Sequence, residues 1–454
     1  MGNILTSLLN STGALQVYDR VFNVIQNNIT NANTPGYAKQ DQALVSMAFN
    51  PSEQMWGGLQ AGPTISARNE YIEQDVRTQQ QQLGDAQQRA SDLGQVQPLF
   101  DPTSTNGIAG SINSFFNSFS QLAVNPNDQV ARQSVIESAN QVAQSFQTTS
   151  IGLGQVSHNA ENQTRNAVTT INQLTAQITS LNQQYRSNSS ANQDAGLDAQ
   201  MHAALESLSS IANFSVIKTS DGATNVYLGG QTPLVIGETQ FTLTSDFSSP
   251  QTVIRDSQMN DVTSQINSGS LGALIQEKNT TLPGYLAQLN TLAQNFADQV
   301  NGQLSQGVDK NGSAPLTNLF SYNQPSDAAF SISVSDISPD QIAAATAAAP
   351  GGNGNAIAVS QLANAPAVNG FTFTQAYGDL SAQIGRDVSS AQQDQTQSQD
   401  LVTQAQQQRQ TQSGVSLDEE AAKMLQFQQA YQAVGKLVGV LNELTQTVIN
   451  MIPQ

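Results

Sequence analysis

The chain closes with the stretch SLDEEAAKMLQFQQAYQAVGKLVGVLNELTQTVINMI, residues 416–452, and this stretch decides the fold. Its apolar side chains recur at steps of three and four, which places them on one narrow stripe of a helix, the seam of a coiled coil. The stripe consists of Met424, Phe427, Tyr431, Val434, Val438, Leu441, Thr445, Val448 and Ile452. We therefore expect an amphipathic helix that needs an apolar partner.

The first residues of this stretch form a helix start. Ser416 is a natural N-cap, and Glu419 three residues later completes the pattern of a capping box. Asp418 and Glu420 favour the positive end of the helix dipole, and Leu417 lies between cap and carboxylates. The last helix is therefore expected to begin at this point.

The start of the chain carries a matching stripe. It consists of Ile4, Leu8, Leu15, Tyr18, Phe22, Ile25 and Ile29, interrupted by Ser11. Because the two stripes can cover each other, we expect the first and last segments to pair, with the rest of the chain inserted between them. The N-terminal helix should end before Asn33-Thr34-Pro35-Gly36-Tyr37, where Pro35 and Gly36 suit the second and third positions of a tight turn.

Between the ends, helical and extended patterns alternate. The Trp56-Gly57-Gly58-Leu59 stretch indicates a turn between short extended pieces, and hairpins are expected around Asp221-Gly222 and Gly237-Glu238. The period of a helix with breaks runs from about Asp128 to Tyr185, and Pro283-Gly284 interrupts a later one. The predicted fold is mainly α with a smaller β part: paired N- and C-terminal coiled-coil helices, a long helical bundle and an inserted β-rich domain.

These patterns predict a division of the chain. Its parts are an N-terminal assembly helix (1–32) that pairs with a C-terminal assembly helix (416–454), a helical bundle domain with a short extended segment near its start (33–211), a small β-rich domain (212–268), a return helix of the bundle (269–320), an irregular Ala/Gly-rich segment that could hold short strands (321–370) and a bundle helix (371–415). The structure of residues 306–370 cannot be placed from the sequence.

Composition excludes several classes of function. With Asp+Glu 34 against Lys+Arg 16, the chain is a poor candidate for tracking nucleic-acid phosphates or an anionic membrane surface. Cysteine is absent, so disulfides and thiolate metal sites are excluded. The two histidines, His158 and His202, lie in polar helical surroundings, and we expect surface roles for both.

Sequence signals for membrane insertion, secretion and catalysis are missing. No apolar run approaches a membrane span, and residues 1–10 lack the features of a cleaved signal peptide. Gly351-Gly352-Asn353-Gly354 follows an Ala-rich segment and fits a flexible turn better than a dinucleotide loop. Asp309-Lys310-Asn311-Gly312 lacks the later acidic ligands of a calcium loop. We expect no catalytic residue, cofactor or metal.

The terminal stripes leave two interpretations open. A pair of helices exposes much of its flanks, and ordering so long a segment costs backbone freedom that one buried stripe does not obviously offset. On one interpretation the ends become fully ordered only when further helices pack against them. On the other, they form an ordinary intramolecular coiled coil.

The end motifs also resemble a known family. Ala32-Asn33-Thr34-Pro35-Gly36-Tyr37 resembles the motif shared by bacterial flagellar rod, hook and hook-associated proteins. Ser413 to Ala422, followed by Leu425 to Tyr431, is similar to the C-terminal signature of the hook-associated protein 1 family. Shorter likenesses lie between them, at Ser114-Phe115-Phe116, Asn125-Pro126 and Val226-Tyr227-Leu228-Gly229.

This resemblance implies a structural role at the hook–filament junction of the flagellum. It implies a ring of self-associated subunits whose terminal helices form an inner tube, with the hook protein and a second junction protein as neighbours. It also implies extracellular location after export without a cleaved signal peptide, with an export chaperone at the C-terminal region. The terminal stripes would be the assembly interface, and the resemblance favours ends that become ordered on assembly.

Two departures and two alternatives accompany the resemblance. Near the β-rich part, where the family often has acidic and arginine residues, this chain reads Leu197-Asp198-Ala199-Gln200-Met201, so a salt bridge expected there could be missing. Little outer-domain insertion is visible, which predicts a compact exterior. The alternatives are another axial flagellar protein, such as the hook or distal-rod protein, and a flagellum-borne secreted enzyme with a site in 306–370.

Overall fold

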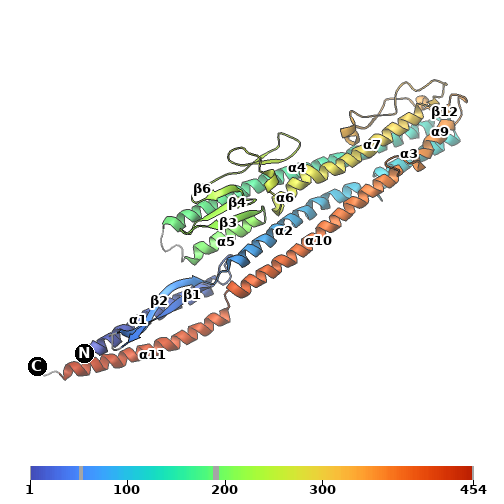
Figure 1. The fold of residues 1–454 in the computed structure, drawn as a ribbon. Coiled ribbons are helices and arrows are strands. Elements are labelled where there is room, and N and C mark those ends of the chain that lie inside the picture. The colour runs from blue at the N-terminus through green and yellow to red at the C-terminus, as the bar shows by residue number, and fades with distance from the viewer. Residues whose placement is uncertain (1, 51–54, 188–193, 452–454) are drawn as a thin grey trace. The chain divides into compact units, whose positions relative to one another are not determined.

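The computed structural model describes residues 2–50, 55–187 and 194–451, and it is mainly α-helical with a smaller β part, as predicted (Figure 1). The chain forms two compact units. Unit 1 comprises 1–83, 170–243 and 398–454, and unit 2 comprises 84–169 and 244–397. Helices α2 (Glu70–Val96), α4 (Gln129–Ser187) and α10 (Phe373–Ser413) contribute residues to both.

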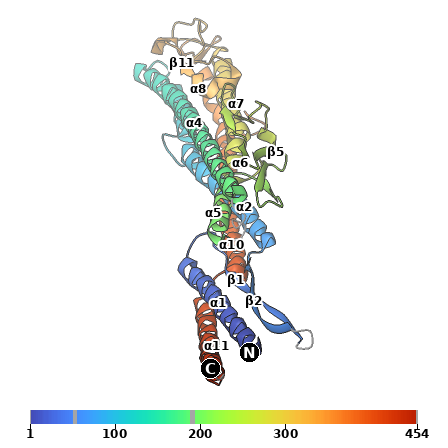
Figure 2. The ribbon, with the colours of Figure 1, turned by 90° about the vertical axis from the view of Figure 1, so that its left-hand side faces the viewer.

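Unit 1 contains both ends of the chain. Its other elements are α1 (Gly2–Asn31), β1 (Gln40–Asn50), β2 (Met55–Ser66), α5 (Ala195–Ser209), β3 (Phe214–Lys218), β4 (Thr224–Leu228), β5 (Thr232–Ile236), β6 (Thr239–Gln240) and α11 (Leu417–Asn450). Figures 1 and 2 show α1 and α11 lying side by side, with the two termini at the same end of the pair. We call α1, β1, β2 and α11 the terminal arm.

The arm includes a long β-hairpin beside α1. β1 and β2 pair antiparallel from Gln40↔Ser66 to Asn50↔Met55. The predicted turn at Gly57-Gly58 is wrong, because both glycines lie inside β2, where Gly58 stands opposite Met47. Their φ angles of 67° and 137° bend the strand locally without reversing it, which is why the glycine pair resembles a turn in the sequence.

A four-stranded sheet of order β3-β4-β5-β6 packs beside α4 and α5 in unit 1. The predicted hairpin around Asp221-Gly222 is confirmed, since β3 and β4 pair from Phe214↔Leu228 to Lys218↔Thr224. The hairpin expected around Gly237-Glu238 is also confirmed, since Ile236 pairs with Thr239, and its return strand β6 has two residues. The chain leaves the sheet at Leu243, where the backbone N–H donates to the Oδ1 of Asn172 on α4 (2.9 Å).

Unit 2 is built around long helices. Its further elements are η2 (Gln97–Phe100), α3 (Ile108–Val124), β7 (Thr244–Asp246), β8 (Val253–Arg255), η4 (Thr263–Gln265), α6 (Gly269–Gln276), η5 (Glu277–Thr281) and α7 (Leu282–Leu304). β7 and β8 form a separate two-stranded sheet, so the strands of 212–268 fall into both units. Helix α4 runs without the predicted breaks.

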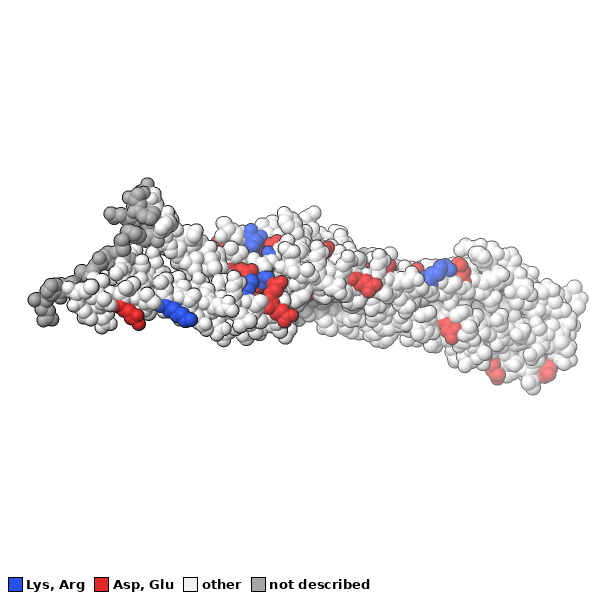
Figure 3. All heavy atoms as spheres, turned by 90° about the horizontal axis from the view of Figure 1, so that it is seen from below, with Lys and Arg blue, Asp and Glu red and all other residues white. Residues whose placement is uncertain are grey.

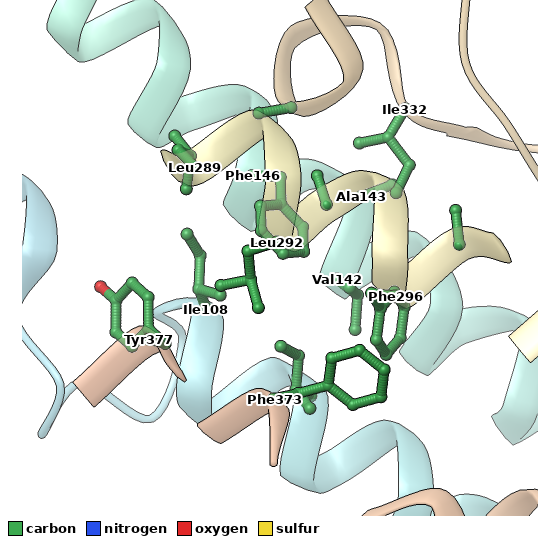
Figure 4. Packing of buried hydrophobic residues seen from close by; sticks show 14 of the residues in the cluster. Ile108, Val142, Ala143, Phe146, Leu289, Leu292, Phe296, Ile332, Phe373 and Tyr377 are labelled. Atoms are coloured by element: carbon green, nitrogen blue, oxygen red, sulfur yellow. The ribbon is translucent and has the colours of Figure 1, made fainter. Parts of the chain in front are cut away.

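The expected interruption at Pro283-Gly284 is also absent. Pro283 lies in the first turn of α7, where a missing backbone N–H costs little, and the π-helical turn η5 joins α7 to α6. The apolar face therefore stays continuous. Figure 4 shows the result: Phe296 of α7 packs against Phe146 of α4 and Phe373 of α10 in the core of unit 2.

The segment that the sequence could not place folds onto unit 2. It contains β9 (Gly307–Val308), β10 (Phe320–Ser321), η6 (Pro325–Asp327), α8 (Ala328–Ser331), β11 (Ser333–Val334), η7 (Pro339–Gln341), β12 (Ala345–Thr346), α9 (Gly354–Gln361) and η8 (Leu362–Asn364). Ala343, Ala344 and Ala345 are buried, and the guanidinium of Arg132 donates to the carbonyls of Pro126 and Ile342 (2.8 Å each). Small side chains and backbone bonds, rather than a regular period, hold this segment.

Candidate assembly interface

The terminal helices of unit 1 pack together with the predicted stripes facing each other. The rings of Tyr18 and Phe427 lie 5.9 Å apart and those of Phe22 and Tyr431 lie 6.0 Å apart, measured between centroids. The remaining described stripe residues of α11 are half-buried: Met424, Val434, Val438, Leu441, Thr445 and Val448. Ile452 lies outside the described residues. The chain's own N-terminal helix therefore occupies the stripe of α11.

The stripe of α1 is covered unevenly. Ile25 is buried, Ile4, Leu8 and Leu15 are half-buried, and Ile29 at the far end is exposed. The break at Ser11 is a buried hydroxyl that donates to the Ser7 carbonyl (2.8 Å). This polar position therefore fits the helix without an outside partner.

A second buried face of α1 went unrecognised in the sequence. Val17 and Val21 are each 5% exposed and lie on the same side of the helix as Asn10 and Asn28. Those two asparagines donate to backbone carbonyls of the hairpin, at Gly57 (2.9 Å) and Gln40 (2.8 Å). Because two of these four positions are polar, their spacing of seven, four and seven does not stand out as an apolar stripe. Helix α1 is therefore covered by α11 on one face and by the hairpin on another.

Next to the seam, the described part of the arm exposes large apolar side chains. On α11 and at the residue that caps its C-terminal end, Leu437, Val440, Leu444 and Met451 recur at helical spacing and are 47–76% exposed. We call these four residues the flanking row. Further exposed apolar residues of the two helices are Leu5, Leu9, Leu417, Leu425 and Ile449. These exposed apolar residues make this side of the arm a candidate assembly interface.

The end of α1 forms the tight turn that the sequence predicted. The Tyr37 N–H donates to the Thr34 carbonyl (3.1 Å), so Pro35 and Gly36 occupy the second and third positions. Gly36 has a φ of +75°, which confirms the expected left-handed conformation. Asn33, Thr34 and Pro35 are exposed, and they present the motif on the surface.

The two end motifs meet at Asn28. Its Oδ1 accepts from the Tyr37 hydroxyl and from the Gln40 N–H (2.9 Å each), and its Nδ2 donates to Glu420 Oε2 (3.0 Å). Burial, together with the charge of Glu420, raises the pKa of Tyr37 to about 12, so the phenol stays protonated and donates. A buried carboxylate needs such partners, and Lys423 Nζ lies 3.6 Å from its other oxygen.

The start of α11 differs in part from the predicted capping box. The Ser416 side chain accepts from the Glu419 N–H (3.4 Å), as expected of an N-cap. The Glu419 carboxylate instead faces Lys39, whose Nζ lies 3.3 Å away. Asp418 is exposed in the first turn, whereas Glu420 is fully buried. Glu420 therefore does more than favour the helix dipole, because it is buried and accepts a hydrogen bond from Asn28.

A cluster of charges lies where the arm meets the rest of unit 1. Arg68 Nε donates to Asp198 (2.7 Å), Nη1 to Glu73 (2.6 Å) and Nη2 to the Gly36 carbonyl (2.5 Å). Arg409 Nη1 adds a bond to Glu206 (2.7 Å). The expectation that a salt bridge is missing near Asp198 is therefore wrong. Its partner comes from a position 130 residues earlier, which local sequence could not reveal.

His202 belongs to the same cluster, and its predicted surface role is wrong. Its side chain is 5% exposed and lies near two carboxylates of α2, Glu70 and Glu73, and its Nε2 lies 3.7 Å from Asp198. Burial, reinforced by Arg68, keeps the pKa of His202 well below its usual value, so the imidazole is neutral. His158 is exposed, as expected.

A cavity of about 210 Å³ borders the cluster on the side of the arm. Its lining includes the Asn33–Tyr37 turn, Arg68, Arg409 and the Ser413–Val415 link before α11.

Within the described residues, no group of His, Asp or Glu is arranged to hold a metal ion. No described helix has the length and apolar character needed to cross a membrane. On the face shown in Figure 3, charged side chains are sparse, in line with a charged content of 11%.

Comparison with known families gives matches in both the middle and the end of the chain. Residues 93–320 match the family model described as "Flagellar hook-associated protein FlgK helical domain". Residues 406–451 match a second model, described as "Flagellar basal body rod FlgEFG protein C-terminal". Together with the paired, motif-bearing ends, these matches define the class of protein as a structural component of the bacterial flagellum.

Individual relatives agree with that class. Flagellar hook-associated protein 1 of Bacillus subtilis (strain 168) is 26% identical, and the alignment covers 96% of both chains. The protein of the same name from Salmonella typhimurium is also 26% identical, over 71% of this chain and 60% of its own length. The solved structure of the flagellar hook junction protein FlgK from Burkholderia pseudomallei has the same fold, with a TM-score of 0.67, 19% identity, and coverage of 76% of this chain and 100% of that chain.

Because the helical-domain model spans half of the chain, the protein belongs to the FlgK family of flagellar hook-associated proteins. The family predicted from the end motifs is thereby confirmed. The hook and rod alternatives account only for the match at 406–451, a segment whose model is named after rod proteins.

Proposed function

We propose that this protein is the adaptor subunit that joins the flagellar hook to the filament. In this proposal, copies assemble through their terminal arms into a hollow ring. The observation that carries the proposal is the flanking row, together with Leu5 and Leu9, because these apolar side chains are left 47–76% exposed. Burying them against a neighbouring arm would release a free energy that the lone chain cannot gain.

The terminal stripes keep their place in the proposed interface, as its inner seam. Within one arm the stripes hold α1 to α11, as the Tyr18–Phe427 and Phe22–Tyr431 ring pairs illustrate. The flanking row then meets the neighbouring copy. The seam and the flanking row therefore have different tasks, and they can be tested separately.

The two ends of the arm are held differently. At the end where the arm meets the rest of unit 1, which we call the junction end, a hydrogen bond between Asn28 and Glu420 joins α1 to the start of α11. At the free end, Leu5, Leu444 and Met451 remain open to solvent. We infer that the junction end is ordered in the lone chain, whereas the free end becomes fully ordered only when neighbouring arms cover it.

Family membership supports a proposal for the neighbours and for the export route. We propose the hook protein on one side of the ring, a second junction protein on the other, and an export chaperone bound at the C-terminal region before assembly. Export proceeds without a cleaved signal peptide, and the final location is extracellular. The role is structural and non-enzymatic, with no cofactor, metal, nucleic acid or membrane insertion.

The experiment compares two variants in a strain that lacks the protein. Leu437→Asp with Leu444→Asp places charges in the flanking row, and the matched control, Leu316→Asp, changes a leucine of unit 2 that is 91% exposed. We expect the double variant to fold normally, judged by circular dichroism, but to leave hooks without filaments and to shed filament protein. The control should restore motility. Normal filaments on the double variant would contradict the proposal.

A further inference from the structure

Polar contacts join the terminal arm to the rest of unit 1. The Lys39 N–H donates to the Ser413 carbonyl (2.8 Å), and the Ala67 N–H donates to the Lys39 carbonyl (2.8 Å). The Ser413 hydroxyl donates to the Ala67 carbonyl (3.0 Å). Beside these bonds lies the cavity of about 210 Å³, so tight contacts do not fill this place. Directional hydrogen bonds are therefore needed to hold the arm at one angle.

Arg68 is placed to do so. Its guanidinium donates in three directions: to Gly36 at the turn of the arm, to Glu73 on α2 and to Asp198 on α5. The side chain is 5% exposed, so these bonds are shielded from water. A guanidinium is planar and rigid, and three bonds in fixed directions define an orientation that a lysine ammonium cannot reproduce.

Gly36 provides the matching contact surface on the arm. A Cβ on Gly36 would collide with the backbone carbonyl of Ala199 on α5, so the turn lies directly against that helix. Its φ of +75° also disfavours any side chain. The glycine therefore brings the carbonyl that Arg68 binds up to α5.

The chain enters the arm a second time at the end of α10, and this segment also contacts the Glu73 carboxylate. Arg409, near the end of α10, lies 3.5 Å from Glu73 and bonds Glu206 of α5. Five residues later, Gly414 begins the link to α11, and the Gly414 N–H donates to the Gln410 carbonyl (3.0 Å). Glu73 therefore contacts Arg68, which follows β2, and Arg409, which lies near the end of α10. It links the two segments that lead into the arm.

From this geometry we infer that Arg68 is a positioning residue that sets the angle between the terminal arm and helices α2 and α5. Its consequence for ring assembly rests on the proposed function, whereas the angle itself is a property of the lone chain. Replacement by lysine keeps the charge but gives up the simultaneous bonds, so the arm should sample a wider range of angles.

The test uses the absence of cysteine from the chain, which makes any introduced pair unique. Spin labels at Ser207→Cys on α5 and Ala422→Cys near the start of α11 report the angle, since both positions are exposed and lie near the junction. Distance distributions are measured by double electron–electron resonance on the full-length protein. The variants are R68K, Gly36→Ala and the control R186K, since Arg186 pairs with Asp221 (2.8 Å) in the same unit at 45% side-chain exposure.

We expect R68K and Gly36→Ala to broaden or shift the distribution, with unchanged helical circular dichroism, and R186K to leave it as it was. Complementation with R68K should give fewer filaments per cell than R186K. A distribution in R68K equal to that in R186K would overturn the inference. The inference would also be overturned if R68K lost helical circular dichroism while Gly36→Ala kept the parent's distance distribution. Arg68 would then be needed for folding and not for the angle of the arm. If the unlabelled protein proved not to assemble on hooks, the proposed function would fail while the distance result would stand.

Discussion

Asn28 and Glu420, 392 positions apart in the sequence, share a buried hydrogen bond of 3.0 Å between Nδ2 and Oε2. Both residues are fully buried. The Oδ1 of the same amide accepts hydrogen bonds from the Tyr37 hydroxyl and from the Gln40 N–H. One asparagine therefore connects the end of α1, the following turn, the hairpin and the start of α11.

Removing this amide should destabilise the arm. Asn28→Ala leaves the buried Glu420 carboxylate without its donor, and we expect the free energy of unfolding of unit 1 to fall by about 3 kcal/mol. Asn27→Ala, one position away on the exposed side, is the control. Denaturant unfolding followed by circular dichroism measures both. Equal stability of the two variants would show that the bond contributes nothing.

A charge placed in the seam should disrupt assembly, whereas a charge placed beside the β3–β6 sheet should disrupt only that sheet. Phe427→Asp places a carboxylate against Tyr18, so the helices of the arm should part and filaments should be lost. Leu243→Asp, at a position 2% exposed beside the β3–β6 sheet, should damage that sheet and leave the seam usable. Limited proteolysis distinguishes them: cleavage in the arm for the first variant, and in 212–243 for the second. Motility with attached filaments in Phe427→Asp would refute the seam assignment.

A buried acid in unit 2 should make stability depend on pH. Burial, with Asp92 adjacent, raises the pKa of Glu277 from 4.5 to about 10, so the folded chain holds a proton that the unfolded chain releases. The stabilising contribution is complete below pH 4.5. It is lost as pH rises toward 10, by about 1.4 kcal/mol per pH unit while only the folded state is protonated.

Glu277→Gln copies the protonated form and should remove this slope. Thermal unfolding between pH 5 and 9 measures it, and the variant should gain most over the parent chain at the alkaline end. Glu137→Gln, on the exposed surface of α4, serves as the control. Parallel pH curves for the parent and Glu277→Gln would contradict the prediction.

Arg132 should matter for the irregular segment of unit 2. Arg132 is 1% exposed, and its guanidinium donates to the carbonyls of Pro126 and Ile342. Arg132→Met leaves these carbonyls unsatisfied, and we expect a loss of about 3 kcal/mol in unfolding free energy. It should also speed proteolysis within 306–345. Arg386→Met, at an exposed position of α10, should behave like the parent chain.

The sequence predicted what depends on local spacing. The steps of three and four located the seam, and Pro35-Gly36 located the turn, because each is a property of neighbouring residues. Residue spacing could not reveal contacts that only the fold creates, such as Arg68 with Asp198 or the burial of His202. The flanking row escaped notice for a different reason: Leu437 and Leu444 are interleaved with the seam residues Val438 and Leu441, so one apolar pattern conceals two faces.

We propose that neighbouring copies cover the free end of the arm. Hydrogen–deuterium exchange of the lone chain and of hook-attached assemblies tests it directly, read over residues 4–18 and 437–451. We expect fast amide exchange there in the lone chain, slow exchange after assembly, and slow exchange around Asn28 and Glu420 in both. Equally slow exchange of 4–18 and 437–451 in dilute, unassembled protein would contradict it.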